Sequence, residues 1–232
     1  MSVAHQLNEV LANIAAAEAR AGRPQGSVAL LAVSKTFPAA DVAQAYAAGQ
    51  RLFGENRLQE AMEKMPALPA DCSWHLIGPL QRNKVRKALE QGFALIQAVD
   101  SLKLAQAISR IAGELGKRAC ILLEVNIDAE ESKHGFSPTE LRAAWADLVE
   151  LPHLEIQGLM CIPAPVDDPE QARPAFAALR TLAEELRSRG PLPLPTLSMG
   201  MSHDYTVAVE EGSTLVRVGS AIFGHRDYGT TP

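Results

Sequence analysis

The chain has 232 residues, of which 47% are hydrophobic and 21% are charged. This composition supports a full hydrophobic core and excludes disordered, collagen-like and disulfide-scaffold proteins. The 22 Lys and Arg against 27 Asp and Glu give a net charge of -5, which disfavours nucleic acid as a general partner. We expect any anion-binding site to be local, within either one large α/β barrel or two small domains.

The cysteines and the N-terminal segment indicate the compartment. Cys72, Cys120 and Cys161 form no C-x-x-C pair and have no histidine at metal-ligand spacing, so we expect buried thiols in a reducing cytoplasm and no metal site. No apolar run approaches the roughly 20 residues of a membrane helix, and residues 1–20 lack a signal-peptide pattern. The sequence therefore predicts a cytoplasmic protein without a membrane partner.

The chain begins with an amphipathic pattern and continues as a repeating unit. Apolar residues from Val3 through Leu7, Val10 and Leu11 to Ile14 mark one face of a helix that ends near residue 22. Short β-branched or leucine-rich runs then alternate with longer segments of helical period, which is typical of βα units around a parallel sheet. Eight strands are predicted over residues 28–33, 52–53, 73–77, 95–99, 120–126, 154–161, 196–198 and 215–218.

Several residues between these strands are suited to the ends of helices. Pro38 fits a first helical turn, and Gly49 is suited to end that helix. Asp100 or Ser101 is suited to the N-cap of a later helix. Ser137, followed by Pro138, is suited to the start of another helix.

The pattern favours a single α/β domain over residues 1–232: a (β/α)8 TIM barrel with an extra N-terminal helix, residues 1–22, packed on it. The alternative is an open doubly wound sheet. Against it, no G-x-G-x-x-G follows the first strand, which runs instead into Ser34, Lys35 and Thr36. The proline-rich segment 190–196 resembles a linker, but the roughly 36 residues after it are too few for an independent domain.

Chemistry in such a barrel lies at the carboxyl ends of the strands. Lys35 directly follows the first strand, where partial burial lowers the pKa of the amine and makes it a nucleophile for an aldehyde. The alternative interpretation is an ordinary surface lysine.

The last two strands suggest a phosphate site. Ser202 ends a glycine-containing loop before a helical stretch, and Gly219 with Ser220 offers an amide and a hydroxyl after the eighth strand. Arg217 would direct a charged guanidinium into the barrel, although a structural salt bridge is the commoner role of a strand arginine.

Other polar residues have less specific patterns. His75 is interpreted as a core histidine rather than a base, and residues 128–135 as a solvated loop rather than a lid. A basic cluster forms either the outer face of a helix or a docking site for an acidic partner. Its members are Arg82, Lys84, Arg86 and Lys87.

Seven motifs occur in order between residues 33 and 228: VSKTFP, GENRLQE, WHLIGPLQRNK, EVNIDAEESKHG, GLMCIP, LSMGMSHDY and GSTLVRVGSAIFGHRDY. Together they resemble the YggS/PROSC family of pyridoxal-phosphate-binding proteins, also called pyridoxal phosphate homeostasis proteins. The resemblance covers nearly the whole chain.

The resemblance implies a barrel of the alanine racemase kind, fold type III, that carries pyridoxal 5′-phosphate as a covalent imine to Lys35. By the same resemblance Arg217 faces the ring nitrogen and no residue is catalytic. The remaining implied cofactor-binding residues are Ser202, Gly219 and Ser220 at the phosphate and Asn56, Ile77 and Met199 along the ring. The family more often has threonine where Ser220 stands and asparagine where His203 stands; serine keeps the hydroxyl.

Two functions follow from this resemblance. One is a non-catalytic protein that holds the cofactor, takes part in its homeostasis and contacts apo-enzymes transiently. The other is an amino-acid racemase or lyase, which Arg217 disfavours because a guanidinium leaves the ring nitrogen unprotonated. A racemase also needs a second acid or base from another domain, for which a chain ending at Pro232 has no room, so we expect a monomer. Without the resemblance, Lys35 also suits an aldolase-like sugar-phosphate enzyme.

Overall fold

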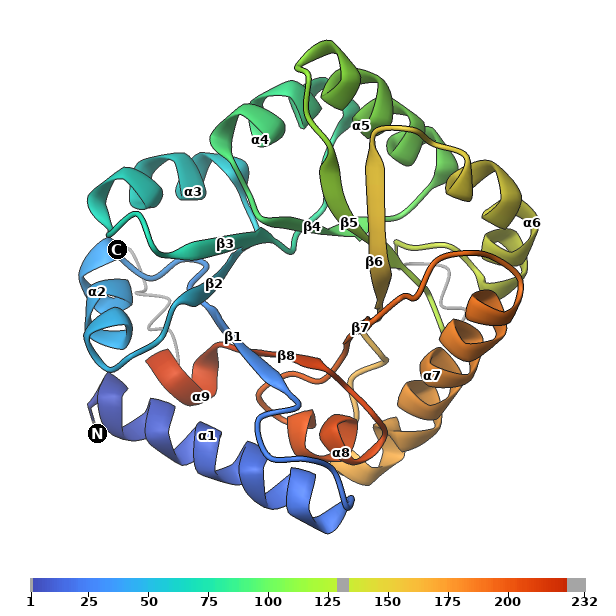
Figure 1. Ribbon diagram of the computed structural model, residues 1–232. Coiled ribbons are helices and arrows are strands. Elements are labelled where there is room, and N and C mark those ends of the chain that lie inside the picture. The colour runs from blue at the N-terminus through green and yellow to red at the C-terminus, as the bar shows by residue number, and fades with distance from the viewer. Residues whose placement is uncertain (1, 129–133, 225–232) are drawn as a thin grey trace, which may run out of the picture.

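The computed structural model describes residues 2–128 and 134–224. Eight parallel strands form a closed barrel in the order of the chain, with β1 paired to both β2 and β8 (Figure 1). This confirms the predicted (β/α)8 fold and excludes the open sheet. The strands are β1 (Ala29–Val33), β2 (Leu52–Glu55), β3 (Ser73–Leu76), β4 (Leu95–Val99), β5 (Ala119–Glu124), β6 (Leu154–Met160), β7 (Thr196–Ser198) and β8 (Leu215–Val218).

The helices form an outer ring around the strands, and α1 covers the side of the barrel where β1 meets β8 (Figure 1). The α-helices are α1 (Val3–Arg20), α2 (Ala39–Ala47), α3 (Leu58–Lys64), α4 (Val85–Gln91), α5 (Leu102–Glu114), α6 (Pro138–Val149), α7 (Arg173–Ser188), α8 (Tyr205–Glu210) and α9 (Ser220–Phe223). Three 3-10 turns are η1 (Met65–Ala67), η2 (Arg82–Lys84) and η3 (Pro169–Ala172). The organisation of residues 1–232 as one domain stays a prediction.

The residues that the sequence assigns to helix ends lie at or beside those ends. Ser101 accepts a hydrogen bond from the Leu104 amide, and Ser137 forms a capping box with Glu140. Pro38 lies at the N-cap of α2, one residue before the first turn in which it was expected. Gly49 follows the end of α2 with φ of 102°, a left-handed conformation that favours glycine.

Side chains along a regular strand alternate between the barrel interior and the helix layer. In β1, Leu31 and Val33 belong to a small interior cluster, whereas Leu30 and Ala32 pack in a cluster with residues of α1 and α2. Because the strands are short, this alternation also decides which residues just beyond each strand end face the interior. It therefore positions the functional groups at the carboxyl ends of the strands.

Strand β4 interrupts this alternation. Ile96 and Val99 both pack in the large cluster under the outer helices, and the register with β5 shifts between them. Two successive residues, Gln97 and Ala98, consequently share the interior side: Ala98 lies in an interior cluster, and Gln97 bonds to His75. The bulge thus brings an additional polar side chain into the barrel.

Some sequence expectations differ from the structure. Strand β2 extends two residues beyond the predicted 52–53, whereas β5 ends at Glu124 instead of residue 126. Leu11, assigned to the buried face of the first helix, is 43% exposed because the packed face is centred on Leu7, Val10 and Ile14.

Only one of the three cysteines is buried as predicted. Cys161 is buried, whereas Cys72 and Cys120 are half-buried, and none forms a disulfide. Partial burial raises the pKa of the Cys72 and Cys120 thiols, so both thiols are less reactive than an exposed cysteine.

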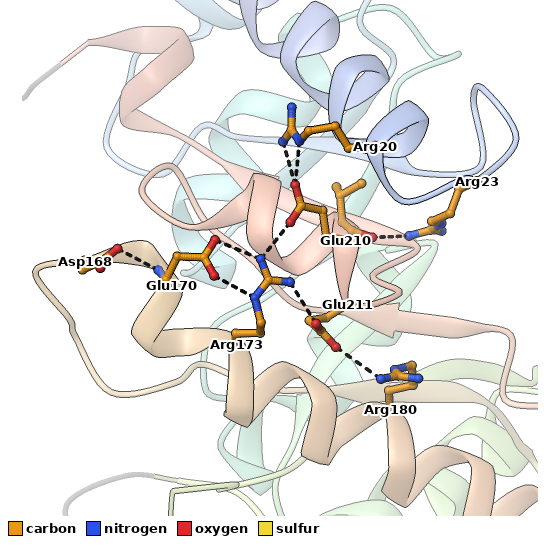
Figure 2. Close-up of polar contacts among 9 residues, drawn as sticks. Arg20, Arg23, Asp168, Glu170, Arg173, Arg180, Glu210 and Glu211 are labelled. Carbon is orange, nitrogen blue, oxygen red and sulfur yellow. Dashed lines mark hydrogen bonds and ion pairs between the residues drawn. The ribbon is translucent and has the colours of Figure 1, made fainter.

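Charged side chains join α1 to α7 and α8, as Figure 2 shows. Arg173 reaches Glu170 at 2.7 Å, Glu210 at 2.8 Å and Glu211 at 2.9 Å, and Arg20 of α1 shares Glu210 at 2.8 Å. Isolated surface pairs contribute little to stability, but a network with a shared centre fixes several elements relative to one another. Here the network holds α8, the helix after the loop that contains Ser202, which is predicted to bind phosphate.

Glu18 connects α1 to the start of the barrel and is 1% exposed. Its carboxylate accepts from the Gly26 amide at 2.9 Å, the Val28 amide at 2.8 Å and the Ser27 hydroxyl at 3.1 Å. These bonds fix the turn that leads from α1 into β1.

Glu18→Ala should lower the free energy of unfolding by about 2 to 4 kcal/mol, because it leaves backbone donors without their charged acceptor. Urea unfolding measures the loss. Glu9→Ala, at an exposed position of the same helix, serves as the control. Equal stabilities of the two variants would contradict the anchoring role.

Candidate functional site

A cavity of about 680 Å³ opens at the carboxyl ends of the strands. Seven of the eight residues that the sequence predicts for the site line it, and they come from the ends of β1, β2, β3 and β8 and from the loop after β7. These seven are Lys35, Asn56, Ile77, Ser202, Arg217, Gly219 and Ser220. The structure therefore brings together groups that lie far apart in the sequence.

Lys35 is half-buried in this cavity. It continues the inward series of Leu31 and Val33 by one further step of two residues, which is why a lysine just beyond β1 faces the interior. The alternative interpretation of an ordinary surface lysine does not fit this position.

Arg217 is 4% exposed in the middle of β8. Its Nη1 donates to the Ser198 carbonyl and hydroxyl, both at 2.7 Å, and its Nη2 donates to the Cys161 carbonyl at 2.8 Å. Since a guanidinium has five N–H donors, these bonds leave Nε–H and one Nη2 proton for other partners. Among the residues that the structure describes no carboxylate forms an ion pair with it, so a structural salt bridge is not its role there.

The arginine is the end of a buried polar chain that crosses the barrel. Ser198 donates its hydroxyl to Gln97 Oε1 at 2.6 Å, and Gln97 Nε2 lies 2.8 Å from His75 Nδ1. Because the amide nitrogen can only donate, His75 Nδ1 must accept, and the ring is neutral with its proton on Nε2. Burial lowers the pKa of His75 to about 4, which agrees with the interpretation as a core histidine.

Ser202 closes the part of the cavity between the loops after β7 and β8. Its hydroxyl oxygen accepts from the Gly219 amide at 3.2 Å and the Ala221 amide at 3.4 Å. The preceding turn is tight: Gly200 has φ of 94°, and a Cβ there would lie 2.5 Å from the Ala208 Cβ. The Gly219 and Ala221 amides bond to Ser202 in this structure, and the hydroxyl groups of Ser202 and Ser220 lie in the same corner of the cavity, as suits an anion.

Close backbone contact also positions Asn56 and Ile77. A Cβ at Gly78 would lie 2.2 Å from the Asn56 carbonyl oxygen, so only glycine lets the ends of β2 and β3 approach this closely. This brings the two side chains to the same wall of the cavity.

Met199 was wrongly placed at the site. It is fully buried in the cluster under the outer helices, and Met201 lines the cavity instead. The alternation explains the difference: Ser198 faces inward to bond Arg217, so the next residue faces outward. Applied to the SMGMS motif, this period would have excluded Met199, but it would not have selected Met201, which follows the turn at Gly200.

The sequence interpretation also missed three polar lining residues, Glu124, Asn126 and His134. Glu124 is 8% exposed, and burial, reinforced by Asp100, raises the pKa of its carboxyl. It lies two residues after the inward Leu122, so the same alternation would have pointed to it.

The remaining predicted features lie at or outside the rim. His203 is exposed at the cavity, with Nε2 3.0 Å from the Asp167 carbonyl oxygen. In the basic cluster, Arg86 pairs with Glu114 of α5, which favours the outer-face interpretation for that residue. Residues 129–133 of the predicted loop lie outside the described part of the chain.

Residues 2–128 and 134–224 contain no group of three or more His, Cys, Asp or Glu side chains that could hold a metal ion. No helix of this part of the chain is long and apolar enough to span a membrane.

Comparison with known proteins decides the family. Residues 6–227 match the family model of the alanine racemase N-terminal domain. A pyridoxal phosphate homeostasis protein of Pseudomonas aeruginosa is 47% identical, with 98% of this chain and 97% of the relative covered. That of Aquifex aeolicus is 42% identical, with 98% and 100% covered. The chain belongs to the family of pyridoxal phosphate homeostasis proteins.

Solved structures place this family member among its relatives. PipY of Synechococcus elongatus, solved with pyridoxal phosphate bound, is 43% identical, with a TM-score of 0.83 and coverage of 96% of this chain and 100% of PipY. Alanine racemase of Clostridium difficile is 16% identical, with a TM-score of 0.75 over 96% of this chain and 57% of the racemase. At that identity the likeness shows the shared barrel fold alone.

The neutral state of His75 in this family member predicts an acid-dependent loss of stability. Its pKa is about 4 in the folded protein against 6.5 ordinarily, so the unfolded chain binds the extra proton between these values. The stabilisation is complete above pH 6.5 and falls as the pH falls toward 4, by up to about 3 kcal/mol.

His75→Asn should reduce this pH dependence, because asparagine keeps a polar partner for Gln97 without a titrating ring. Urea unfolding across this pH range measures the slope, with the exposed His203→Asn as the control. The hypothesis is wrong if both variants retain the wild-type slope.

Proposed function

We propose that this protein binds pyridoxal 5′-phosphate, holds it as an imine to Lys35 and takes part in its intracellular homeostasis. The observation that carries the proposal is that one cavity gathers an inward lysine, a buried arginine with two available donors and the hydroxyl and amide groups of Ser202, Gly219 and Ser220. The names of the relatives and the ligand of PipY support it.

The residues present fit each part of this cofactor. Ser202, Gly219 and Ser220 would hold the phosphate, because hydroxyl and amide donors suit a dianion. Arg217 would face the ring nitrogen with the donors that Ser198 and Cys161 leave available. The side chains that would line the ring are Asn56, Ile77 and Met201, the last in place of the predicted Met199.

Lys35 supplies the covalent attachment. Its amine would add to the aldehyde carbon of the bound cofactor; both amine protons leave with the aldehyde oxygen as one water, and a C=N bond remains. When bound, pyridoxal phosphate supplies a reactive aldehyde and an electron-accepting ring. Holding that aldehyde as an imine would lower the concentration of free aldehyde while leaving the aldehyde recoverable by hydrolysis.

We further propose that the protein does not catalyse an amino-acid reaction. The guanidinium of Arg217 is fixed by two carbonyl groups, and although burial lowers its pKa, arginine stays protonated in proteins. A ring nitrogen facing it would remain unprotonated and accept electrons weakly. His75, the first candidate for a second base, is not among the described residues that line the cavity, and its Nδ1 is committed to Gln97.

The proposal also covers the compartment, the oligomeric state and the release of the cofactor. We place the protein in the cytoplasm as a monomer that releases pyridoxal phosphate to apo-enzymes through transient contacts. A cofactor held as an imine in an open cavity can be retained and then released by hydrolysis, with water as the only other reactant. The racemase or lyase activity is the alternative that the second experiment below tests.

Borohydride reduction of the protein with pyridoxal phosphate should fix a phosphopyridoxyl group on Lys35, because it is the only lysine among the described residues that lines the cavity. Peptide mass spectrometry locates the group. Lys35→Ala should lose the visible imine band and keep weaker binding through the phosphate-binding residues. Recovery of the label chiefly on another lysine would overturn the assignment.

The loaded protein should exchange the α-proton of alanine, serine or threonine no faster than free pyridoxal phosphate does. NMR in deuterated buffer measures this exchange directly. Lys35→Ala is the control, since it removes the covalent attachment without altering Arg217. Exchange well above the rate of free cofactor, and abolished in that variant, would favour the racemase or lyase alternative.

A further inference from the structure

A charged cluster lies behind the loop that carries Lys35, on the helix side of the barrel. Glu55 at the end of β2 is fully buried, and the Lys64 side chain of α3 is 10% exposed. Lys64 Nζ donates to Glu55 Oε1 at 2.9 Å and to the Ser34 carbonyl at 2.8 Å, while the Ser34 hydroxyl donates to Glu55 Oε1 at 2.6 Å. The residue before Lys35 is therefore held through both its backbone and its side chain.

The residue after Lys35 is held as well, in an unusual conformation. Thr36 has φ of 67°, in the left-handed region that a β-branched residue rarely adopts. Its amide donates to Glu60 Oε2 at 2.8 Å, and the same carboxylate oxygen lies 3.7 Å from Lys64 Nζ. Because this conformation is strained, it persists only where surrounding groups enforce it.

Stability alone does not account for this cluster. Removing two charges from water offsets much of their attraction, so a buried ion pair often adds little to the free energy of folding. Glu55 Oε2 is buried without a hydrogen-bond partner, and burial raises the pKa of this carboxyl. Thr36, with its strained backbone, and Ser34, which bonds to the buried ion pair, thus flank Lys35, the proposed attachment lysine.

We propose that Lys64, together with Glu55 and Glu60, acts as a positioning group that fixes the direction of the Lys35 amine in the cavity. The inference rests on the proposed function, in which that amine attacks an aldehyde held by the phosphate-binding residues. Lys64 holds the Ser34 carbonyl and, through Glu60, the Thr36 amide. The Lys35 backbone between them then cannot rotate, and its side chain continues the inward series of β1.

Loss of this hold lets Thr36 relax to a negative φ, which turns the adjoining peptide and moves the amine away from the position of the aldehyde. Imine formation should slow, because covalent reactions depend steeply on the alignment of the reacting atoms. Binding of the phosphate and ring should persist, since none of the cluster residues is among the described residues that line the cavity.

The test compares Lys64→Met with Lys87→Met, which removes an exposed lysine of α4. Stopped-flow absorbance measures the rate at which the apo-protein forms the imine band. Calorimetry measures the affinity for pyridoxine 5′-phosphate, which has the phosphate and ring but no aldehyde. We expect Lys64→Met to slow imine formation by about tenfold or more, with the affinity for pyridoxine 5′-phosphate and the behaviour of Lys87→Met unchanged.

A second pair of variants decides the question if Lys64→Met does not fold. Glu60→Ala removes the acceptor of the Thr36 amide at a partly exposed position, whereas Glu60→Gln keeps an amide oxygen there. Glu60→Ala should slow imine formation, and Glu60→Gln should restore most of the rate. That rescue would not follow from a general effect on stability.

Two results would overturn the positioning role. One is a wild-type imine rate in Glu60→Ala and in folded Lys64→Met; the other is a parallel loss of pyridoxine 5′-phosphate affinity, which indicates collapse of the site. Failure of the proposed function is distinguishable: the wild type would then form no imine band, or Lys35→Ala would form one as readily as the wild type.

Discussion

A single buried cation organises the interior of this barrel. Arg217 of β8 is only 4% exposed, so most of its donors must find acceptors among the neighbouring strands. It takes the carbonyls of Cys161 and Ser198, at the ends of β6 and β7, together with the Ser198 hydroxyl. Carbonyl partners orient the guanidinium without neutralising it. The positive charge therefore stays available at the base of the cavity.

The requirement for acceptors extends to the opposite wall. Ser198 can accept from Arg217 in this geometry because its own proton goes to Gln97, which in turn donates to His75. The bulge in β4 is what makes Gln97 face inward beside Ala98. An irregular backbone in one strand thus supports the charged group of another, and the histidine at the end of the chain remains neutral.

The repeating architecture was predictable from the sequence because hydrophobic period and capping residues act locally. Strands β4, β7 and β8 match their predicted bounds, and seven of the eight site residues that the motifs predicted line the cavity. Prediction failed where the facing of a side chain depends on a neighbour, as with Met199, whose direction follows from Ser198. The β4 bulge and the left-handed Thr36 leave no local signature, since tertiary contacts impose them.

Closure of the barrel also determines when, during synthesis of the chain, the site forms. Ala29 pairs with Leu215, and Arg20 bonds to Glu210 across a separation of 190 residues. At about 5 to 20 residues per second, synthesis of Arg217 follows that of Lys35 by roughly 10 to 40 s. Throughout that interval the nascent chain contains the lysine without the arginine or the loops after β7 and β8. The complete cavity therefore forms only when the last strand docks against the first.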